Sequence, residues 1–367
     1  MNSPQSTFRY AEHLQATLGW LLHSIEAGGG GSSAHFSPLR GWSAPYPETT
    51  GYIIPTLLEA ARTQKDQRCQ EAALRAGQWL LSLQCPDGAW PGGLYVGGKP
   101  QGPSVFNTAQ IIDGMVALAR LQPEGPWMQA SERAAGWLAA GVDSAGLWQV
   151  GNYRNGVNPS YYAQVAWPML QAWQLSGDDA VRAAAERVLA RIVDLRTPHG
   201  SIAGWGFDPG KPAFTHTIAY TLRGLIESAG ALENWAAYGQ PCEDALERLW
   251  RKAEFGNGRL PGAFHDDWRP VNWYTCLTGN AQVALCLLRI EQRANDLRLV
   301  NAATKLVDSV CANQRIRGVG DSRRGAVGGS APLWGRYMFM RYPNWAAKYH
   351  ADALMMLMAR LEEEDAR

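Results

Sequence analysis

Apolar and polar positions along this chain follow a long repeat. In six places an apolar, helix-like run ends in a glycine-rich loop, and the runs start roughly 57 residues apart, a period that indicates a repeat architecture. Tryptophan recurs at equivalent points in four of these runs. The six runs begin at Leu18, Gly77, Ala135, Leu189, Leu246 and Thr304.

A second and more apolar helix follows each loop. Its apolar residues recur at i, i+3, i+4 and i+7, the pattern of a helix packed into a core. A single hairpin of this kind cannot bury its apolar face, whereas six stacked hairpins can close into a ring. The sequence therefore predicts an all-α (α/α)6 toroid, one domain over residues 1–367, with long glycine- and aromatic-rich loops at one end. The second, inner helices are expected over 49–61, 106–121, 161–175, 214–229, 277–291 and 348–363.

The charge balance and the cysteines narrow the class of protein. Lys and Arg total 34 and Asp and Glu total 33, without a basic run, so nucleic acid and anionic membranes are poor partners. The six cysteines are scattered, which favours a reducing compartment. No apolar run is long enough for a membrane span, and the first residues do not resemble a signal peptide. We therefore expect a cytoplasmic protein without a transmembrane span, of open oligomeric state.

Residues 75–90, RAGQWLLSLQCPDGAW, resemble the QW motif of squalene and oxidosqualene cyclases. The resemblance implies a toroid scaffold that terpenoid cyclases, protein prenyltransferase β-subunits and many carbohydrate-active enzymes share, so it indicates fold more than chemistry. We expect Gln84 to bond to backbone and Trp90 to pack on a helix, which would tie an outer helix to its neighbour. The matching residues are Arg75, Gly77, Trp79, Leu80, Gln84, Gly88 and Trp90.

Two of the expected inner helices carry a further resemblance. Residues 47–61 and 214–229 are similar to uncharacterised squalene-cyclase-like proteins of bacterial polysaccharide-biosynthesis regions. This resemblance implies a glycan or lipid-linked oligosaccharide as substrate, but it assigns no role to any residue. The sixteen tryptophans agree with it, because flat aromatic faces suit stacking on sugar rings.

The loops and the first turns of the inner helices are expected to meet at one end of the axis, where catalytic groups would gather. His216 and His350 open two inner helices and are candidate general bases, with Tyr349 beside the second. The candidate carboxylates are Glu48, Asp208, Asp266 and Asp267.

Asp208 and Asp267 also have a simpler interpretation, since Asp is common in turns and at helix N-caps. The aromatic, amide and arginine side chains of the same region are candidate substrate-binding groups. They are Trp42, Tyr46, Tyr52, Trp90, Asn107, Gln110, Arg154, Tyr162, Gln164, Trp205, Trp268, Trp273, Asn280, Arg336, Arg341 and Trp345.

Two reaction types fit these residues. Abstraction of the proton alpha to a uronate carboxylate, as in a C5-epimerase or a lyase, needs a base and a group that neutralises the carboxylate. Hydrolysis instead needs two carboxyl groups about 5–10 Å apart. The bases at the inner helix starts favour proton abstraction. A terpenoid cyclase or prenyltransferase-like enzyme and a non-catalytic glycan-binding toroid are the alternatives, although the Asp-rich motifs of the cyclases are missing.

Cys276 and His350 are similar to the zinc ligands of protein prenyltransferase β-subunits. That family places an Asp two residues before its cysteine, and Tyr274 stands at this position here. We therefore expect no metal site and no cofactor from the sequence.

Overall fold

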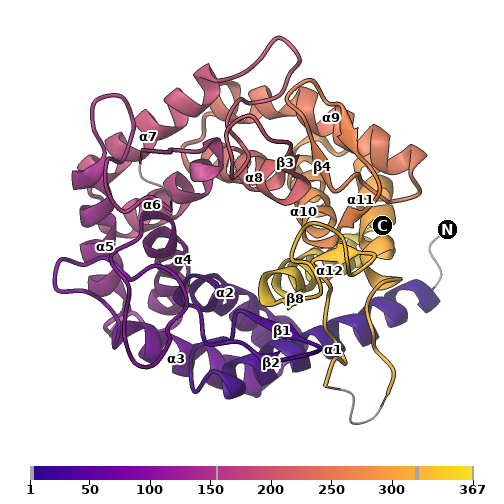
Figure 1. Cartoon of the computed structure of the whole chain (residues 1–367), viewed down its shortest axis with the longest axis horizontal. Helices are drawn as coiled ribbons and strands as arrows, with labels where there is room; N and C mark the ends of the chain where they lie inside the picture. Colours follow the sequence, from indigo (N-terminus) through magenta and orange to yellow (C-terminus); the bar gives the residue numbers. More distant parts are fainter. Residues whose placement is uncertain (1–3, 154–155, 319–321, 366–367) are drawn as a thin grey trace.

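The computed structural model describes residues 4–153, 156–318 and 322–365, which form a ring of helices around a central axis (Figure 1). The helices alternate between an outer and an inner layer along the chain, and each inner helix packs on the next around the ring. The outer helices are α1 (Pro4–Ala27), α3 (Gln67–Leu81), α5 (Trp127–Gly141), α7 (Asp179–Asp194), α9 (Gln240–Phe255) and α11 (Leu297–Cys311). The inner helices are α2 (Pro47–Gln64), α4 (Val105–Leu121), α6 (Ala163–Ser176), α8 (Thr215–Ala231), α10 (Leu277–Ala294) and α12 (Asn344–Asp365). The (α/α)6 toroid predicted from the repeat is confirmed.

The two layers differ in composition because they differ in burial. An inner helix contacts neighbours on several sides, and nearly every residue of the first three turns of α4 and α8 is buried. An outer helix buries one face only, so its opposite face is polar. Asp66, Asp178 and Asp296 cap three outer helices by accepting a hydrogen bond from a backbone N–H two residues ahead.

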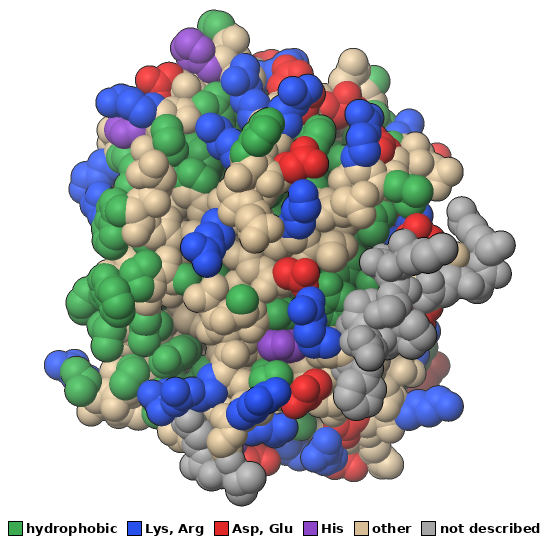
Figure 2. All heavy atoms as spheres, turned by 90° about the vertical axis from the view of Figure 1, so that its right-hand side faces the viewer, with side chains coloured by type: hydrophobic (Ala, Val, Ile, Leu, Met, Phe, Trp, Pro, Cys, Tyr) green, Lys and Arg blue, Asp and Glu red, His purple; other side chains and the backbone are tan. Residues whose placement is uncertain are grey.

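The ring closes where its first and last units meet, on the right-hand side of Figure 1. Helix α1 packs against α12, and α12 packs against α2. At the loop end, strand β1 (His35–Ser37) pairs antiparallel with both β2 (Gly41–Trp42) and β8 (Tyr342–Pro343), so residues from both ends of the chain share one small sheet. Figure 2 turns this side toward the viewer and shows basic and acidic side chains intermixed over its described part, in line with the balanced charge.

The remaining regular elements are short and lie mainly in the loops. Strands β3, β4 and β5 form one small antiparallel sheet, and β6 and β7 form another. Their bounds are Ala213–Phe214, Ala263–Phe264, Pro270–Val271, Thr275–Cys276 and Ser330–Ala331, and single turns of 3-10 and π-helix cover Ser160–Tyr162 and Trp235–Gly239. None of the described helices is both long enough and apolar enough to cross a bilayer.

The QW-like segment is a structural tie, as predicted. The Gln84 side-chain amide donates to the carbonyls of Gly88 and Ala130, each at 2.9 Å, and Ala130 belongs to the neighbouring outer helix α5. Trp90 is completely buried and its indole N–H donates to the Leu80 carbonyl at 2.7 Å. Gly88 has a φ of +98°, and a Cβ there would lie 2.6 Å from the Arg133 carbonyl, so this position requires glycine.

Candidate active site

The central axis is lined by side chains that touch across the ring. Phe106 of α4 lies 5.7 Å from Tyr220 of α8, measured between ring centroids, although α6 separates these two helices around the ring. Tyr220 likewise lies 5.8 Å from Tyr349 of α12, with α10 between their helices. Such contacts are possible only through the middle of the toroid. We call the following residues the axial cluster: Tyr46, Glu48, Tyr52, Phe106, His216, Tyr220, Tyr337, Trp345 and Tyr349.

The axial cluster is built in layers, one helical turn apart. Glu48, Phe106, His216 and Trp345 are each the second residue of an inner helix, at the end where the loops gather. Tyr52, Tyr220 and Tyr349 are each the sixth residue of theirs. Because 3.6 residues make one turn, positions two and six lie on nearly the same face and about 6 Å apart along the axis.

Glu48 is the carboxyl group of the axial cluster. Its side chain is only partly exposed and accepts a hydrogen bond from the Tyr46 hydroxyl. Burial raises the pKa of Glu48 to about 7, and the Tyr46 hydrogen bond lowers it by a smaller amount. A carboxyl group with this pKa is present in both protonation states near neutral pH, which suits a general acid or base.

His216 lies in the same layer and is a neutral base. Burial lowers its pKa to about 4, so the imidazole is uncharged at neutral pH. Its Nδ1 lies 2.7 Å from the amide oxygen of Gln282, which makes Nδ1 the hydrogen-bond donor and leaves the lone pair on Nε2. The ring centroid of His216 is 4.3 Å from that of Tyr220 and 5.1 Å from that of Tyr337.

Phenol groups surround the Glu48 carboxyl. Burial, and to a lesser degree the charge of Glu48, raises the pKa of Tyr52, Tyr220 and Tyr337 well above the usual value. These phenols therefore stay protonated and can donate hydrogen bonds to a bound substrate.

A charged layer lies one turn further down the axis, and the sequence analysis missed it. The Lys348 ammonium is 2.6 Å from the Asp352 carboxylate and 4.4 Å from the centroid of the Tyr349 ring. The Arg223 guanidinium lies over the rings of Trp167 and Tyr349, 4.9 and 5.4 Å from their centroids. The sequence contained a sign of this layer, because charged residues interrupt the apolar third turn of the inner helices. We call Asp113, Gln171, Arg223, Lys348 and Asp352 the charged floor.

The acidic and basic side chains of the charged floor offset one another's charge. Burial raises the pKa of Asp113, while Lys348 and Arg223 act to lower it. Burial also lowers the pKa of Lys348. The nine-tenths-buried Arg223 keeps one guanidinium nitrogen, Nη1, without a hydrogen-bond partner among the described residues. A buried donor of this kind can bind an anionic or hydroxyl group of a ligand that reaches it.

His350 is not in the axial cluster, contrary to our expectation. It is the seventh residue of α12, five positions beyond the one that matches His216 in α8. Five residues rotate a side chain by about 140° around the helix, so His350 faces away from the axis. It is completely buried against the outer helices, 3.8 Å from the Cys311 sulfur through Nε2 and 6.4 Å from His13 between ring centroids. Burial lowers its pKa to about 3.

The loop carboxylates also lie outside the axial cluster. Asp267 is exposed and accepts a hydrogen bond from the backbone N–H of Arg269, and the Asp266 side chain is exposed in the same turn. For Asp267, the turn role that the sequence offered as the simpler interpretation is therefore the one observed. Asp208 lies 3.5 Å from the Lys211 ammonium at the loop end of the ring.

A small cavity of about 80 Å³ brings Asp208 near the axial cluster. Asp208, Lys211 and Arg336 line it together with Phe207 and Phe214. The Phe207 ring is 6.5 Å from the His216 ring, and the Phe214 ring is 5.1 Å from the Tyr337 ring. The cavity therefore adjoins the axial cluster and offers charges of both signs.

Most other predicted substrate-binding residues are part of the scaffold. They are buried, and several bond to the backbone of a neighbouring unit, as Gln110 does to Gln164 and Asn280 to Gly258. Of the predicted set, only Tyr46, Tyr52 and Trp345 join the axial cluster. The buried scaffold members are Trp90, Asn107, Gln110, Tyr162, Gln164, Trp205, Trp268 and Asn280.

The remaining predicted groups lie near the surface. Trp42 is half-buried against Trp20, Trp273 is about half exposed, and Arg336 and Arg341 are exposed. Arg154 lies outside the described residues. Cys276 is buried near Tyr274 and Tyr337, whereas His350 lies near His13 and Cys311.

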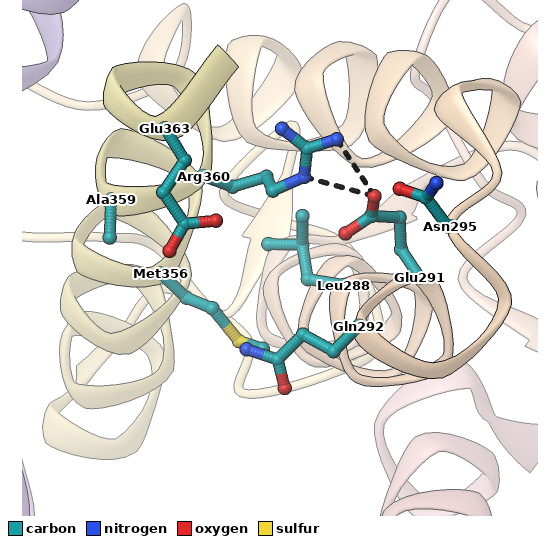
Figure 3. Close-up of a pocket in the computed structure, with 8 residues that line it drawn as sticks. All are labelled: Leu288, Glu291, Gln292, Asn295, Met356, Ala359, Arg360 and Glu363. Atoms are coloured by element: carbon teal, nitrogen blue, oxygen red, sulfur yellow. Dashed lines mark hydrogen bonds and ion pairs between the residues drawn. The ribbon is translucent and has the colours of Figure 1, made fainter. Parts of the chain in front are cut away.

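A larger cavity of about 220 Å³ lies between the last turns of α10 and α12 (Figure 3). Its main polar contact is the pairing of the Arg360 guanidinium with the Glu291 carboxylate at 2.9 Å. This cavity is at the opposite end of the inner helices from Glu48, and its paired charges hold α10 to α12. The chemistry of the axial cluster makes that cluster the better candidate site.

Comparison with known proteins agrees on the fold. No protein-family model and no curated protein matches the chain. Among solved structures, it is similar to cellobiose 2-epimerase from Bacillus thermoamylovorans B4167, with a TM-score of 0.77 and 10% identity over 98% of this chain and 100% of that one. It is also similar to the unsaturated glucuronyl hydrolase of Bacillus sp. GL1, with a TM-score of 0.73 and 16% identity over 96% and 97%.

A third similar structure contains a sugar ligand. It is UGL_D88N/dGlcA-Glc-Rha-Glc, with a TM-score of 0.75 and 15% identity over 96% of this chain and 97% of that one. At these identities the similarity establishes that the chain is an (α/α)6 toroid spanning the whole length of its structural neighbours.

Proposed function

We propose that this protein is a glycan-acting enzyme that uses Glu48 to transfer a proton to or from its substrate. The observation that carries the proposal is a partly exposed carboxyl with a pKa near 7, held on the axis among aromatic rings. Phe106 of the axial cluster contacts Tyr161, which in turn contacts Phe207, and sugar rings stack on flat aromatic faces of this kind. The named activities of the structural neighbours, glucuronyl hydrolysis and sugar epimerisation, support the same class of substrate.

The substrate class we favour is a uronate-containing glycan. Lys211 and Arg336 line the cavity beside Phe207, and a guanidinium or ammonium group there would pair with a uronate carboxylate. The resemblance to proteins of polysaccharide-biosynthesis regions supports a glycan made in such a process. These features agree with an enzyme whose substrate carries a carboxylate next to the reacting carbon.

Proton transfer at C5 of the uronate is the chemistry that a single carboxyl supports best. Glu48, with a pKa of about 7, can take or give a proton near neutral pH, whereas His216, with a pKa of about 4, stays neutral and can accept a hydrogen bond through Nε2. Removal of the C5 proton leaves an enolate-like carboxylate, which Lys211 or Arg336 would stabilise. Return of a proton gives the C5 epimer, and loss of the C4 substituent gives an unsaturated product.

Hydrolysis is the second candidate function. It is favoured by the cavity that brings Asp208 close to Phe207 and His216, because a second carboxyl group there could act together with Glu48. In this mechanism, protonated Glu48 would donate its proton to the leaving-group oxygen.

The test is incubation of the protein in D2O with uronate-containing oligosaccharides, free and lipid-linked, while the H5 signal is followed by NMR. Loss of the H5 signal, with or without an unsaturated product, supports proton abstraction. New reducing ends without exchange support hydrolysis. Binding without either change would favour a glycan-binding toroid, and no binding would bring back an isoprenoid substrate.

A further inference from the structure

A second cluster of reactive side chains lies at the seam where the ring closes. It consists of His13 on α1, Cys311 at the end of α11 and His350 on α12, and we call it the seam cluster. One ring nitrogen of each histidine and the sulfur of Cys311 all lie within 4.8 Å of one another. Figure 1 shows the three helices side by side on the right of the ring. No other group of this kind occurs among the described residues.

The structure fixes how His13 presents its ring. The Gln314 side-chain nitrogen donates to the Thr17 hydroxyl at 2.7 Å and to the Gly325 carbonyl at 2.8 Å. These two bonds orient the amide, so its oxygen accepts from His13 Nδ1 at 2.6 Å. The Nδ1 nitrogen therefore carries the proton and Nε2 keeps its lone pair. A carbonyl partner on the far nitrogen is how proteins commonly orient a metal-binding histidine.

His350 has an unmet requirement for a polar partner. Its side chain is completely buried, and Nδ1 has no hydrogen-bond partner among the described residues. Its Nε2 lies 3.8 Å from the Cys311 sulfur, which is a weak hydrogen-bond partner. A buried imidazole without a strong hydrogen bond is unfavourable, so this ring is expected to bind something that the protein chain alone does not supply.

We propose that the seam cluster binds one zinc ion through His13, Cys311 and His350. Two imidazole nitrogens and a thiolate are ligands that zinc prefers and that Mg²⁺ and Ca²⁺ do not. On binding, the Cys311 thiol releases its proton to solvent and forms the sulfur–zinc bond, and a water molecule completes the coordination.

The three ligand atoms lie within 4.8 Å of one another, and the spacing between Cys311 and His350 is close to that of a zinc site. Zinc bonds of about 2.3 Å to sulfur and about 2.0–2.1 Å to nitrogen place the ligand atoms of a tetrahedral site roughly 3.3–3.6 Å apart. The 3.8 Å between the Cys311 sulfur and His350 Nε2 is near this value. His13 and Cys311 each retain 6% of their surface exposed, which leaves a route for the ion, whereas His350 is fully buried.

The proposed ion would join the first and last units of the ring. His13 and His350 belong to α1 and α12, at opposite ends of the chain, and these two helices pack against each other. The pair between Arg9 and Asp308 joins α1 to α11 beside them. A metal bond across this seam stabilises the closed ring, because it is lost when the two ends separate. The role is structural and independent of Glu48.

The test measures metal binding directly. Protein stripped with a chelator is loaded with Co²⁺ in place of zinc, and its absorption spectrum is recorded. We expect one equivalent to bind, with a sulfur-to-metal charge-transfer band in the near ultraviolet and visible bands of tetrahedral coordination. Zinc should displace Co²⁺ and Mg²⁺ should not. Absence of the charge-transfer band in the wild-type protein would overturn the proposal, without relying on any variant.

Two variants and a melting experiment complete the test. Cys311→Ser should lose the band, whereas the matched control Cys85→Ser, whose thiol is only half-buried and far from the seam cluster in the sequence, should keep it. Zinc at a hundred times its dissociation constant should raise the melting temperature of the wild type by roughly 3–4 °C. If Cys311→Ser does not fold, Cys311→Ala serves in its place. An equal zinc-induced shift in a Cys311 variant would contradict the proposal.

Discussion

The axial cluster and the seam cluster each contain a histidine from an inner helix, yet the two side chains have opposite surroundings. His216 lies on the axis among tyrosine rings and in the same layer as Glu48. His350 lies behind its helix, between α12 and the outer layer, with a thiol and a second histidine. The difference shows that position near the start of an inner helix is not enough for a side chain to reach the axis. The residue must also lie on the face of the helix that points toward the axis.

The residue of α12 that corresponds to His216 of α8 is therefore not His350. Tyr349 of α12 and Tyr220 of α8 are both sixth in their helices, and their rings are 5.8 Å apart across the axis. Trp345 occupies the position that His216 has in α8. His216 of α8 therefore corresponds in position to Trp345 of α12, and the axial cluster has one histidine rather than two.

The largest expected effect is a loss of activity when Glu48 of the axial cluster is changed. Glu48→Gln keeps an oxygen that can accept from the Tyr46 hydroxyl but cannot exchange a proton. We expect turnover of the responsive glycan to fall about 10²–10⁴-fold, since general acid–base groups contribute this much. The matched control is Glu59→Gln, on the same helix but at the surface beside Arg62. Full activity of Glu48→Gln would exclude Glu48 as the proton-transfer group.

The histidines provide the next comparison. His216→Asn should lower turnover by about 10–100-fold, because the variant loses the neutral base of the axial cluster. His350→Asn should leave turnover unchanged and lower the free energy of unfolding by about 1–3 kcal/mol, because it places an unsatisfied amide in a buried site. Turnover and urea unfolding are measured on both variants. Equal losses of turnover would mean that the two regions are coupled.

The sequence predicted the fold better than the site for a physical reason. The repeat of roughly 57 residues and the paired helices depend on many apolar positions, so errors at single residues do not change the result. Whether a residue belongs to the axial cluster depends on which face of its helix it lies on, and this depends on where the helix begins. The sequence placed the start of the last inner helix at Lys348, whereas α12 begins at Asn344. Four residues of error moved His350 into the expected site and left Trp345 among the loop residues.

Loop aromatics were misassigned for a related reason. Trp90 and Trp205 have the composition of a sugar-binding surface, but both are completely buried in the scaffold. Large aromatic residues serve both purposes, and sequence alone does not show which face of a loop is covered. The charged floor could have been predicted more directly, since Asp113 and Arg223 stand in the middle of buried, mainly apolar segments of their helices.

The pH dependence of stability gives a smaller effect that also belongs to the axial cluster. The folded pKa of Glu48 is about 7, above its usual value of 4.5, so the folded state binds more protons than the unfolded state between these two pH values. Stability is therefore greatest below pH 4.5 with respect to this group and is lost as the pH rises through 7. After allowance for partial exposure, the loss is about 1–2 kcal/mol.

Comparison with Glu48→Gln isolates this contribution. The variant does not titrate at this position, so its stability relative to the wild type should increase from pH 5 to pH 8. Urea unfolding of both proteins at the two pH values measures the difference, with Glu59→Gln measured alongside. A constant difference across this range would mean that Glu48 ionises in the folded protein much as it does in the unfolded chain.

The smallest effect concerns the outer scaffold, which neither cluster uses. The Gln84 amide donates to Gly88 within its own loop and to Ala130 on the next outer helix, so Gln84→Ala leaves two carbonyls without this donor. A net hydrogen bond contributes about 1 kcal/mol, and a part-buried carbonyl can recover some of the loss by binding water. We therefore expect a loss of about 1 kcal/mol in unfolding free energy. The matched control is Gln78→Ala, an exposed position on α3, the helix that precedes the loop of Gln84, which should change stability by less than about 0.5 kcal/mol. Because the tie joins neighbouring outer helices and does not reach the axis, turnover and the Co²⁺ spectrum should both stay as in the wild type. A change in either one would show that the outer ring controls the geometry of the axis or of the seam.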